Sequence, residues 1–122
     1  MKQEDKELLL KDLCSRLPYG VKGNYQNSDD ELLRKITITY RYLEPNGMVM
    51  TGDIKPYLFP LSNMTEEQSM EFALLQVNTH KDGFLYVCDC ANMMKWLLKN
   101  HFDIYGLIEK GLAIDATNLN IY

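Results

Sequence analysis

The chain has few cysteines and no long apolar run. Its three cysteines are an odd number, and Cys88 and Cys90 are only two residues apart, a spacing that rarely forms a disulfide without strain. At most one ordinary disulfide could therefore form, and free thiols in a reducing cytoplasm are favoured. No apolar stretch approaches the ~20 residues of a membrane helix, and the charged residues 1–7 are unlike a secretory signal. We therefore expect a cytoplasmic protein that does not span a membrane.

The short motifs of common enzyme classes are also missing. The sequence contains no glycine-rich phosphate loop, no His-Glu-x-x-His zinc motif, no calcium loop and no Gly-x-Ser-x-Gly nucleophile elbow. Cysteine catalysis would need a thiol beside a histidine base and an orienting group, and no local pattern indicates such a set. We therefore predict no catalytic residue and no cofactor.

The best metal candidate in the sequence is His80 followed by Cys88 and Cys90, with Cys14, Asp89 or His101 as the fourth ligand. Structural zinc sites take four nitrogen or sulfur ligands and usually offer cysteine pairs separated by two to four residues. The single Cys-x-Cys pair is tighter than that, and no second pair follows. The alternative, which we favour, is that both thiols pack as small apolar groups, so we expect no bound metal.

The composition is that of an ordinary globular domain. The 122 residues are 46% hydrophobic and 25% charged, and this length suits a single domain, 1–122. The net charge of −4 lies in the second half, since residues 1–61 are balanced. A basic surface for nucleic acid would have to draw on dispersed residues of the first half, namely Arg16, Lys22, Arg34, Lys35 and Arg41.

Residues 3–16 are predicted to form a helix that Pro18 ends. Its apolar spacing indicates a buried stripe of Leu10, Leu13, Cys14 and Leu17. Strands are predicted over 19–25 and, by alternation, over 32–43. The Glu44-Pro-Asn-Gly turn should pair Met48-Val-Met50 back onto the preceding strand. Residues 54–58 should form a further strand that is an edge of the sheet or leaves the sheet at Pro56, because Pro56 cannot donate a hydrogen bond.

The second half is predicted to be mostly helical. Thr65 and Gln68 form the Thr-x-x-Gln pattern of a capping box, which starts a helix to about Asn78 with a buried stripe of Met70, Ala73, Leu74 and Val77. A strand over 84–88, a helix over 90–100 and a short helix over 104–110 should follow, the last capped by Asp103 and ended by Gly111. Residues 112–114 add a short strand, and 115–122 are expected to be a loose tail.

This order of elements predicts an α+β fold. We expect a small antiparallel curved sheet or partly closed barrel of three or four strands. The N-terminal helix and two or three C-terminal helices would pack on it. The segment from Trp96 to Ile114 should fold back on the sheet as a lid, with Leu97, Leu98, Leu107, Ile108 and Leu112 buried.

Two groups of residues are candidates for a partner-binding surface. His101, Asp103 and Tyr105 form a polar cluster between two predicted helices. The functional interpretation is an acid–base pair or the rim of a binding surface. The structural interpretation, which we favour, is that these residues cap the ends of the two helices. Tyr57 and Phe59, set among prolines, are predicted to be exposed, and tyrosine is common at protein interfaces. The candidate surface is therefore Tyr57, Phe59, His101, Asp103 and Tyr105.

Three segments carry a resemblance: Leu17-Pro-Tyr-Gly-Val21, Ile54-Lys-Pro-Tyr-Leu58 and residues 96–114. In these the chain resembles a group of small uncharacterised proteins of gut Bacteroides-type bacteria, often encoded near phage-like or mobile DNA. The resemblance implies a small cytoplasmic protein and no reaction. We therefore expect a non-enzymatic interaction or accessory protein that binds another macromolecule, with a nucleic-acid-associated regulator as the alternative.

Overall fold

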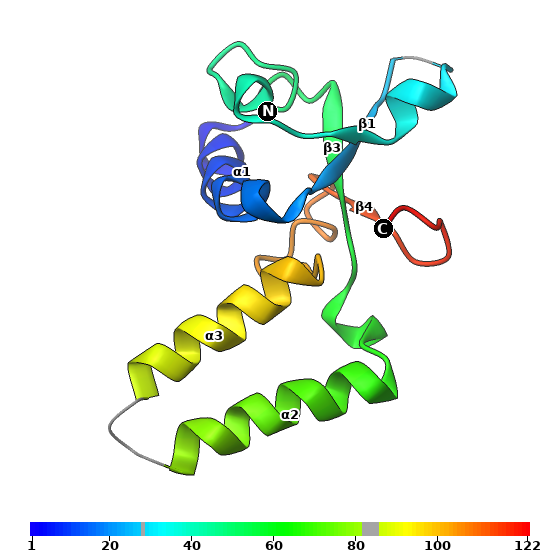
Figure 1. The fold of residues 1–122 in the computed structure, drawn as a ribbon. Coiled ribbons are helices and arrows are strands. Elements are labelled where there is room, and N and C mark those ends of the chain that lie inside the picture. Colours follow the sequence, from blue (N-terminus) through cyan, green and yellow to red (C-terminus); the bar gives the residue numbers. More distant parts are fainter. Residues whose placement is uncertain (28, 82–85) are drawn as a thin grey trace.

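The computed structural model describes residues 1–27, 29–81 and 86–122, and the side chains of 1–27, 29–75 and 90–122. Figure 1 shows a body built from one helix and a sheet, with a pair of helices projecting from it. The fold is α+β, as predicted. The elements in chain order are α1 (Gln3–Arg16), η1 (Leu17–Tyr19), β1 (Lys22–Tyr25), η2 (Glu31–Arg34), β2 (Ile36–Thr37), η3 (Tyr40–Leu43), β3 (Ile54–Leu58), η4 (Leu61–Asn63), α2 (Glu66–Lys81), α3 (Tyr86–Lys99) and β4 (Ile114–Asp115).

The sheet is open and mixed, so the prediction of an antiparallel sheet or partly closed barrel is wrong in part. Four strands lie in the order β2-β1-β3-β4. β1 is antiparallel to β2 and to β3, with Asn24 opposite Lys55, whereas β4 runs parallel to β3, with Tyr57 opposite Ile114. The parallel strand arises because the two C-terminal helices intervene between β3 and β4, and such a crossover returns the chain in the same direction.

The long strand predicted over 32–43 does not form. Only Ile36 and Thr37 pair with β1, and the chain then turns into η3, which leaves Tyr40 largely exposed. The loop after η3 folds back on it, because the Val49 N–H donates to the Tyr42 carbonyl. A Cβ at Gly47 would lie 2.4 Å from that carbonyl oxygen, so only glycine allows this close approach. Met48–Met50 accordingly form turns instead of a hairpin strand.

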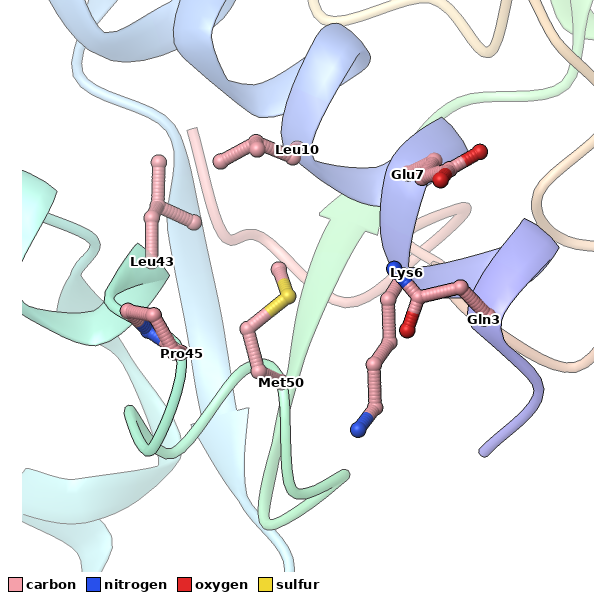
Figure 2. A pocket seen from close by; sticks show the side chains of 7 residues that line it. All are labelled: Gln3, Lys6, Glu7, Leu10, Leu43, Pro45 and Met50. Atoms are coloured by element: carbon pink, nitrogen blue, oxygen red, sulfur yellow. The ribbon is translucent and has the colours of Figure 1, made fainter.

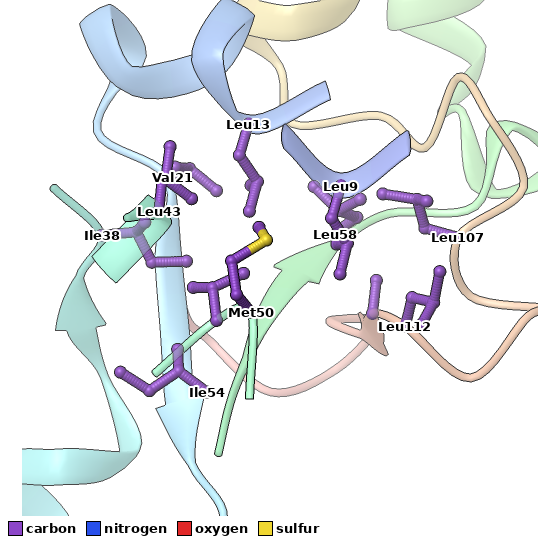
Figure 3. Close-up of a cluster of buried hydrophobic side chains, with 12 residues drawn as sticks. Leu9, Leu13, Val21, Ile38, Leu43, Met50, Ile54, Leu58, Leu107 and Leu112 are labelled. Atoms are coloured by element: carbon purple, nitrogen blue, oxygen red, sulfur yellow. The ribbon is translucent and has the colours of Figure 1, made fainter. Parts of the chain in front are cut away.

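The main core lies between α1 and one face of the sheet (Figure 3). Leu9 and Leu13 of α1 meet the core-facing residues of β3, Ile54 and Leu58. The loop residues Val49 and Met50 fill the space beside them, which explains why a turn segment without regular pairing is nevertheless apolar. The C-terminal segment closes the core with Leu107, Leu112 and Ala113.

The helix predicted over 3–16 is confirmed, but its buried stripe is not the predicted one. Leu10 and Cys14 are exposed, and the buried residues of α1 are Leu9, Asp12, Leu13 and Arg16. Arg16 Nε donates to Asp12 Oδ2 at 2.7 Å, and Nη2 donates to Asp12 Oδ1 and to the Phe102 carbonyl. Each buried residue is thus one position before the predicted one. Both charged side chains of this fully buried ion pair face inward, and this sets the orientation of the helix about its axis.

Residues 115–122 are packed and are not a loose tail. They cross the sheet face opposite α1, where Ala116 and Ile121 cover Tyr57. The Tyr122 hydroxyl donates to the Tyr57 carbonyl at 2.7 Å and accepts the Lys22 N–H at 2.9 Å. The tail therefore ties β1 and β3 together, which local sequence pattern alone does not reveal.

α2 and α3 form an antiparallel hairpin that projects from the body (Figure 1). Phe72 of α2 packs on Trp96 of α3 with ring centroids 5.4 Å apart, and Trp96 stacks in turn on Phe102 of the core. Trp96 Nε1 donates to Glu71 Oε2. Residues 86–88 of the predicted 84–88 strand are helical, and 84–85 lie outside the described residues. No helix in the described part of the chain is long and apolar enough to cross a bilayer.

The predicted capping box at the start of α2 is confirmed. Thr65 Oγ1 accepts the Gln68 N–H at 3.1 Å, and Gln68 Oε1 accepts the Thr65 N–H at 2.9 Å. Both bonds satisfy backbone donors that have no partner within the helix. They fix the first turn of a helix that has little other support from the body.

Thr65→Ala should destabilise α2 by about 1 kcal/mol, because it leaves the Gln68 N–H without its cap. Amide hydrogen exchange in the first turns of α2 should speed up about fivefold, while exchange in α1 stays unchanged. Thr65→Ser, which keeps the hydroxyl, is the matched control. Equal exchange rates in Thr65→Ala and the wild-type protein would contradict the role of the cap.

The helix predicted over 104–110 is reduced to a single turn. Asp103 Oδ1 and Oδ2 accept the N–H groups of Leu107 and Ile108 at 2.9 and 3.0 Å. Gly106 has φ +71°, which stops a regular helix from beginning before it. Gly111, at φ +73°, closes the turn as predicted, with Leu112 N–H donating to the Leu107 carbonyl. Leu98, Leu107 and Leu112 are buried, while Leu97 and Ile108 are half-buried.

Candidate functional site

The predicted partner surface is largely a packing junction. Tyr57 is 5% exposed and Asp103 is buried, so the expectation of an exposed Tyr57 is wrong. The Phe59 N–H donates to the His101 carbonyl and the Asp103 N–H donates to the Phe59 carbonyl, both at 2.8 Å. Tyr105 lies apart from them, beneath Lys11 Nζ. Four of the five predicted residues are therefore close together, but mainly through backbone bonds.

Tyr122 completes this junction and was missed in the sequence. Its ring stacks on His101 with centroids 3.5 Å apart and an angle of 11°, and it also contacts Phe59. No local signal marks an aromatic residue in a polar tail as a packing partner. Only the path of the tail across the sheet brings Tyr122 to His101.

His101 ends α3 in a left-handed conformation, with φ +63°. Its N–H donates to the Leu98 carbonyl and the Phe102 N–H donates to the Leu97 carbonyl, the pattern of a Schellman helix end. Glycine is usual at this position, and a histidine there costs on the order of 1 kcal/mol. The stack on Tyr122 compensates for that strain, so the structural role that we favoured for His101 as a helix end agrees with its geometry.

Burial governs the titration of this junction. It lowers the pKa of His101 to about 4, and the positive charges of Arg16 and Lys22 add to the effect. Burial also raises the pKa of Tyr122 to about 12. His101 Nδ1 is buried and has no hydrogen-bond partner among the described residues. A general base must reach a proton of a bound molecule, and the stacked ring of Tyr122 covers one face of this imidazole.

Of the three cysteines, the structure describes the side chains of Cys14 and Cys90, and both are free thiols. Cys14 and Cys90 are exposed. The side chains of His80 and Cys88, two of the three residues of the predicted metal candidate, lie outside the described residues. Where side chains are described, no three His, Cys, Asp or Glu residues gather as metal ligands.

The basic residues of the first half lie partly on the sheet face that the tail crosses. Lys22 and Lys55 share this face with Tyr57 by the register of β1 and β3. Arg34 and Lys35 line an open hollow of about 500 Å³ beside it. Asp29 lines the same hollow, and Lys35 Nζ donates to the Asn120 carbonyl. Arg16 is buried in its ion pair, so the predicted basic set is divided between the surface and the core.

A smaller hollow of about 250 Å³ lies between α1 and the loop after η3 (Figure 2). Leu10 of α1 faces Leu43 and Met50 across it, and Lys6 and Glu7 form its polar edge. Pockets for small molecules are usually ~300–1,000 Å³, so this hollow suits one apolar side chain of a partner better than a substrate.

The outer face of α2, defined here as Met70, Ala73 and Leu74, is apolar and exposed. Met70 is 65% exposed and Leu74 is 62% exposed, so the prediction that these residues are buried is wrong. The side chain of Val77, the last residue of the predicted stripe, lies outside the described residues. Phe72 and Leu75 occupy the half-buried side instead. The reason is that α2 packs on α3 and projects from the body, so the core never reaches its outer face.

A hollow of about 450 Å³ continues the outer face of α2 toward α3. Leu74 lines it together with Glu71, Trp96 and Lys99. Apolar side chains thus meet both an acidic and a basic side chain at its edge, an arrangement typical of a protein-binding rim.

Compared with known proteins, the chain matches no protein-family model, no curated protein and no solved structure.

Proposed function

We infer that this protein is a non-enzymatic accessory protein that binds another protein through the outer face of α2. The observation that carries the inference is the exposure of Met70 and Leu74 on a helix whose opposite side already packs on α3. A helix that is apolar on both sides belongs in the interior of an assembly. The hairpin therefore lacks a covering element that a partner would supply.

The energetics agree with a binding role. Burying a methionine or leucine side chain contributes roughly 1.5–3 kcal/mol, and the outer face of α2 offers two of them at about one helical turn apart. Residues spaced in this way along a helix are the anchors of helix-in-groove recognition. The chain also resembles proteins encoded near phage-like or mobile DNA. This resemblance supports the proposal of a cytoplasmic accessory protein derived from a mobile element.

The test is affinity capture of the tagged protein from the cells that produce it. The amount of partner captured by a Met70→Glu/Leu74→Glu variant should fall at least tenfold, because each glutamate would leave a charge buried in the interface. Leu32→Glu is the matched control, since Leu32 is 81% exposed on η2, away from the hairpin. A partner captured equally by both variants would contradict the role of the outer face of α2.

A nucleic-acid-associated regulator is the second candidate. It is favoured by Lys22 and Lys55 on one sheet face and by Arg34 and Lys35 at the hollow beside them. Phosphate binding would appear as a mobility shift of DNA or RNA that weakens steeply with salt and is lost in Lys22→Glu/Lys55→Glu. A shift unaffected by that variant would argue against this face.

A further inference from the structure

We propose that the hollow of about 500 Å³ between η2, the tail and the sheet face opposite α1 binds a small organic phosphate. This space is called the η2 hollow here, and the residues that carry the argument are Asn24, Asp29, Arg34, Lys35 and Tyr57. It belongs to the body and lies far from the α2–α3 hairpin (Figure 1). The proposal therefore goes beyond the function inferred above and does not depend on it.

The Tyr57 hydroxyl is a hydrogen-bond donor without an acceptor in the described part of the chain. Tyr57 is 5% exposed, and the only hydrogen bond recorded at its polar atoms outside the sheet is the one that its carbonyl accepts. Its side chain nevertheless reaches the η2 hollow, which it lines. Buried polar groups in native proteins nearly always have a partner. A buried hydroxyl at the bottom of a hollow therefore points to a ligand that accepts from it.

Two basic side chains line the same hollow. Arg34 ends η2 and Lys35 follows it, and among the described residues Arg34 makes no ion pair. Burial raises the pKa of the Tyr57 hydroxyl, and the positive charge of Arg34 opposes that rise, so the guanidinium lies near the hydroxyl. Lys35 Nζ donates to the Asn120 carbonyl at 3.4 Å, which leaves two of its three N–H donors for a ligand.

These three donors suit a phosphate group. A guanidinium donates two parallel N–H bonds to two phosphate oxygens, and a lysine ammonium adds a compact positive charge. The phenol of Tyr57 is neutral near pH 7 because its pKa is raised, so it adds an O–H donor. Arg34, Lys35 and Tyr57 together match the terminal oxygens of a phosphate monoester.

Two acceptors in the hollow favour a phosphate ester over inorganic phosphate. Asn24 lies on the same sheet face as Tyr57, and its Oδ1 is buried without a hydrogen-bond partner among the described residues. Asp29 lines the hollow and makes no ion pair with Arg34 or Lys35. Hydroxyl groups of a ligand would donate to both acceptors, and a volume of about 500 Å³ lies within the range of small-molecule sites. The ligand class is therefore a phosphate ester of a sugar or nucleoside.

The experiment is an NMR titration of the full chain in low salt and without phosphate buffer, in which the amide signals are followed. AMP carries both the phosphate and the hydroxyl groups, so it should shift signals around the η2 hollow with a Kd on the order of 0.1 mM. Inorganic phosphate should bind about threefold more weakly, because it gives Asn24 and Asp29 no hydroxyl donors. Adenosine, which lacks the phosphate, should give no saturable shift.

Four variants test the named groups. Arg34→Gln should raise the Kd for AMP about tenfold. Arg41→Gln, which removes the same charge from an exposed residue of η3, is the matched control and should leave that Kd unchanged. Tyr57→Phe should raise the Kd about threefold without lowering stability, because the hydroxyl bonds to no described residue. Asp29→Asn should bring the Kd values for AMP and inorganic phosphate closer together, since it removes both an acceptor and a repulsive charge.

Several results would overturn the proposal. These are the absence of a saturable shift up to about 20 mM AMP, equal binding of adenosine and AMP, or equal losses in Arg34→Gln and Arg41→Gln. Inorganic phosphate that binds as tightly as AMP would overturn the assignment of an ester.

A single-stranded DNA oligonucleotide distinguishes the two sources of a phosphate group. If the oligonucleotide displaces AMP at a lower phosphate concentration than the Kd of AMP, the ligand is a nucleic acid. That result overturns the small ligand and supports the second candidate function. If AMP binds more tightly than the oligonucleotide per phosphate, the small organic phosphate is supported. Capture of a protein through Met70 and Leu74 is unaffected by either result.

Discussion

Asp12→Ala should lower the free energy of unfolding by about 3–5 kcal/mol. Both side chains of the Asp12–Arg16 pair are fully buried, so the variant leaves an arginine charge in the core without its carboxylate. Arg16 Nη1 already has no hydrogen-bond partner among the described residues, so the site has no spare acceptor. Small domains have only about 5–15 kcal/mol of stability. The loss is therefore a large fraction of the total, and the variant should be only marginally stable. Urea unfolding followed by circular dichroism measures the change.

The double variant Asp12→Leu/Arg16→Met separates the cost of an unpaired charge from the value of the pair. Replacing both partners with apolar residues of similar volume is often neutral or stabilising. Here it also removes the bond to the Phe102 carbonyl, so we expect a loss of about 1 kcal/mol. If the double variant were as unstable as Asp12→Ala, the pair itself would be the stabilising element. If Asp12→Ala were as stable as the wild type, the buried pair would not exist in solution.

Acidification should destabilise the protein through His101 by about 1–2 kcal/mol, which is less than the full shift in pKa implies, because the half-buried ring is partly in contact with water that screens its charge. The pKa of this imidazole falls from an ordinary 6.5 to about 4 in the folded state, and each pKa unit corresponds to about 1.4 kcal/mol. The unfolded chain therefore binds the proton more tightly. The stability contributed by the neutral ring is fully present above pH 6.5 and is lost as the pH falls toward 4.

His101→Phe isolates this effect. Phenylalanine keeps a flat ring on Tyr122 but carries no titrating nitrogen, so its stability should fall less than that of the wild type between pH 6.5 and 4. Carboxylates titrate in both proteins, and the difference between the two curves belongs to His101. Tyr122→Phe, which loses the hydroxyl bonds to Tyr57 and Lys22, should keep the wild-type slope. Parallel curves for His101→Phe and the wild type would show that the imidazole is not buried.

Local chemistry explains which sequence predictions are confirmed. The Thr65–Gln68 capping box and the closure at Gly111 depend on residues within a few positions of each other. Their hydrogen bonds are therefore encoded by spacing alone. The helix at 3–16 follows from a stop at Pro18 and a favourable arrangement of charged ends. In the candidate site, the sequence predicted the roles of His101 and Asp103, because one ends a helix and the other caps the turn that follows.

Several predictions that depended on contacts with a distant element are wrong. Alternation over 32–43 fits a strand, yet only β1 can provide pairing, and it reaches no further than Thr37. The stripe of α1 was displaced because Asp12 and Arg16 satisfy each other in the core. Tyr57 appeared exposed because its neighbours are prolines, but the tail covers it.

The sequence by itself determined the α+β class, the main helices and the residues that cap them, because propensity and capping act within one or two turns of the chain. Only the tertiary structure decided which apolar face each helix buries. The pattern of Met70, Ala73 and Leu74 reads as a core stripe, but the hairpin places it outward because α3 packs on the opposite side. An apolar stripe predicts that one face of a helix is covered. Whether the covering surface belongs to the same chain depends on contacts between residues far apart in sequence.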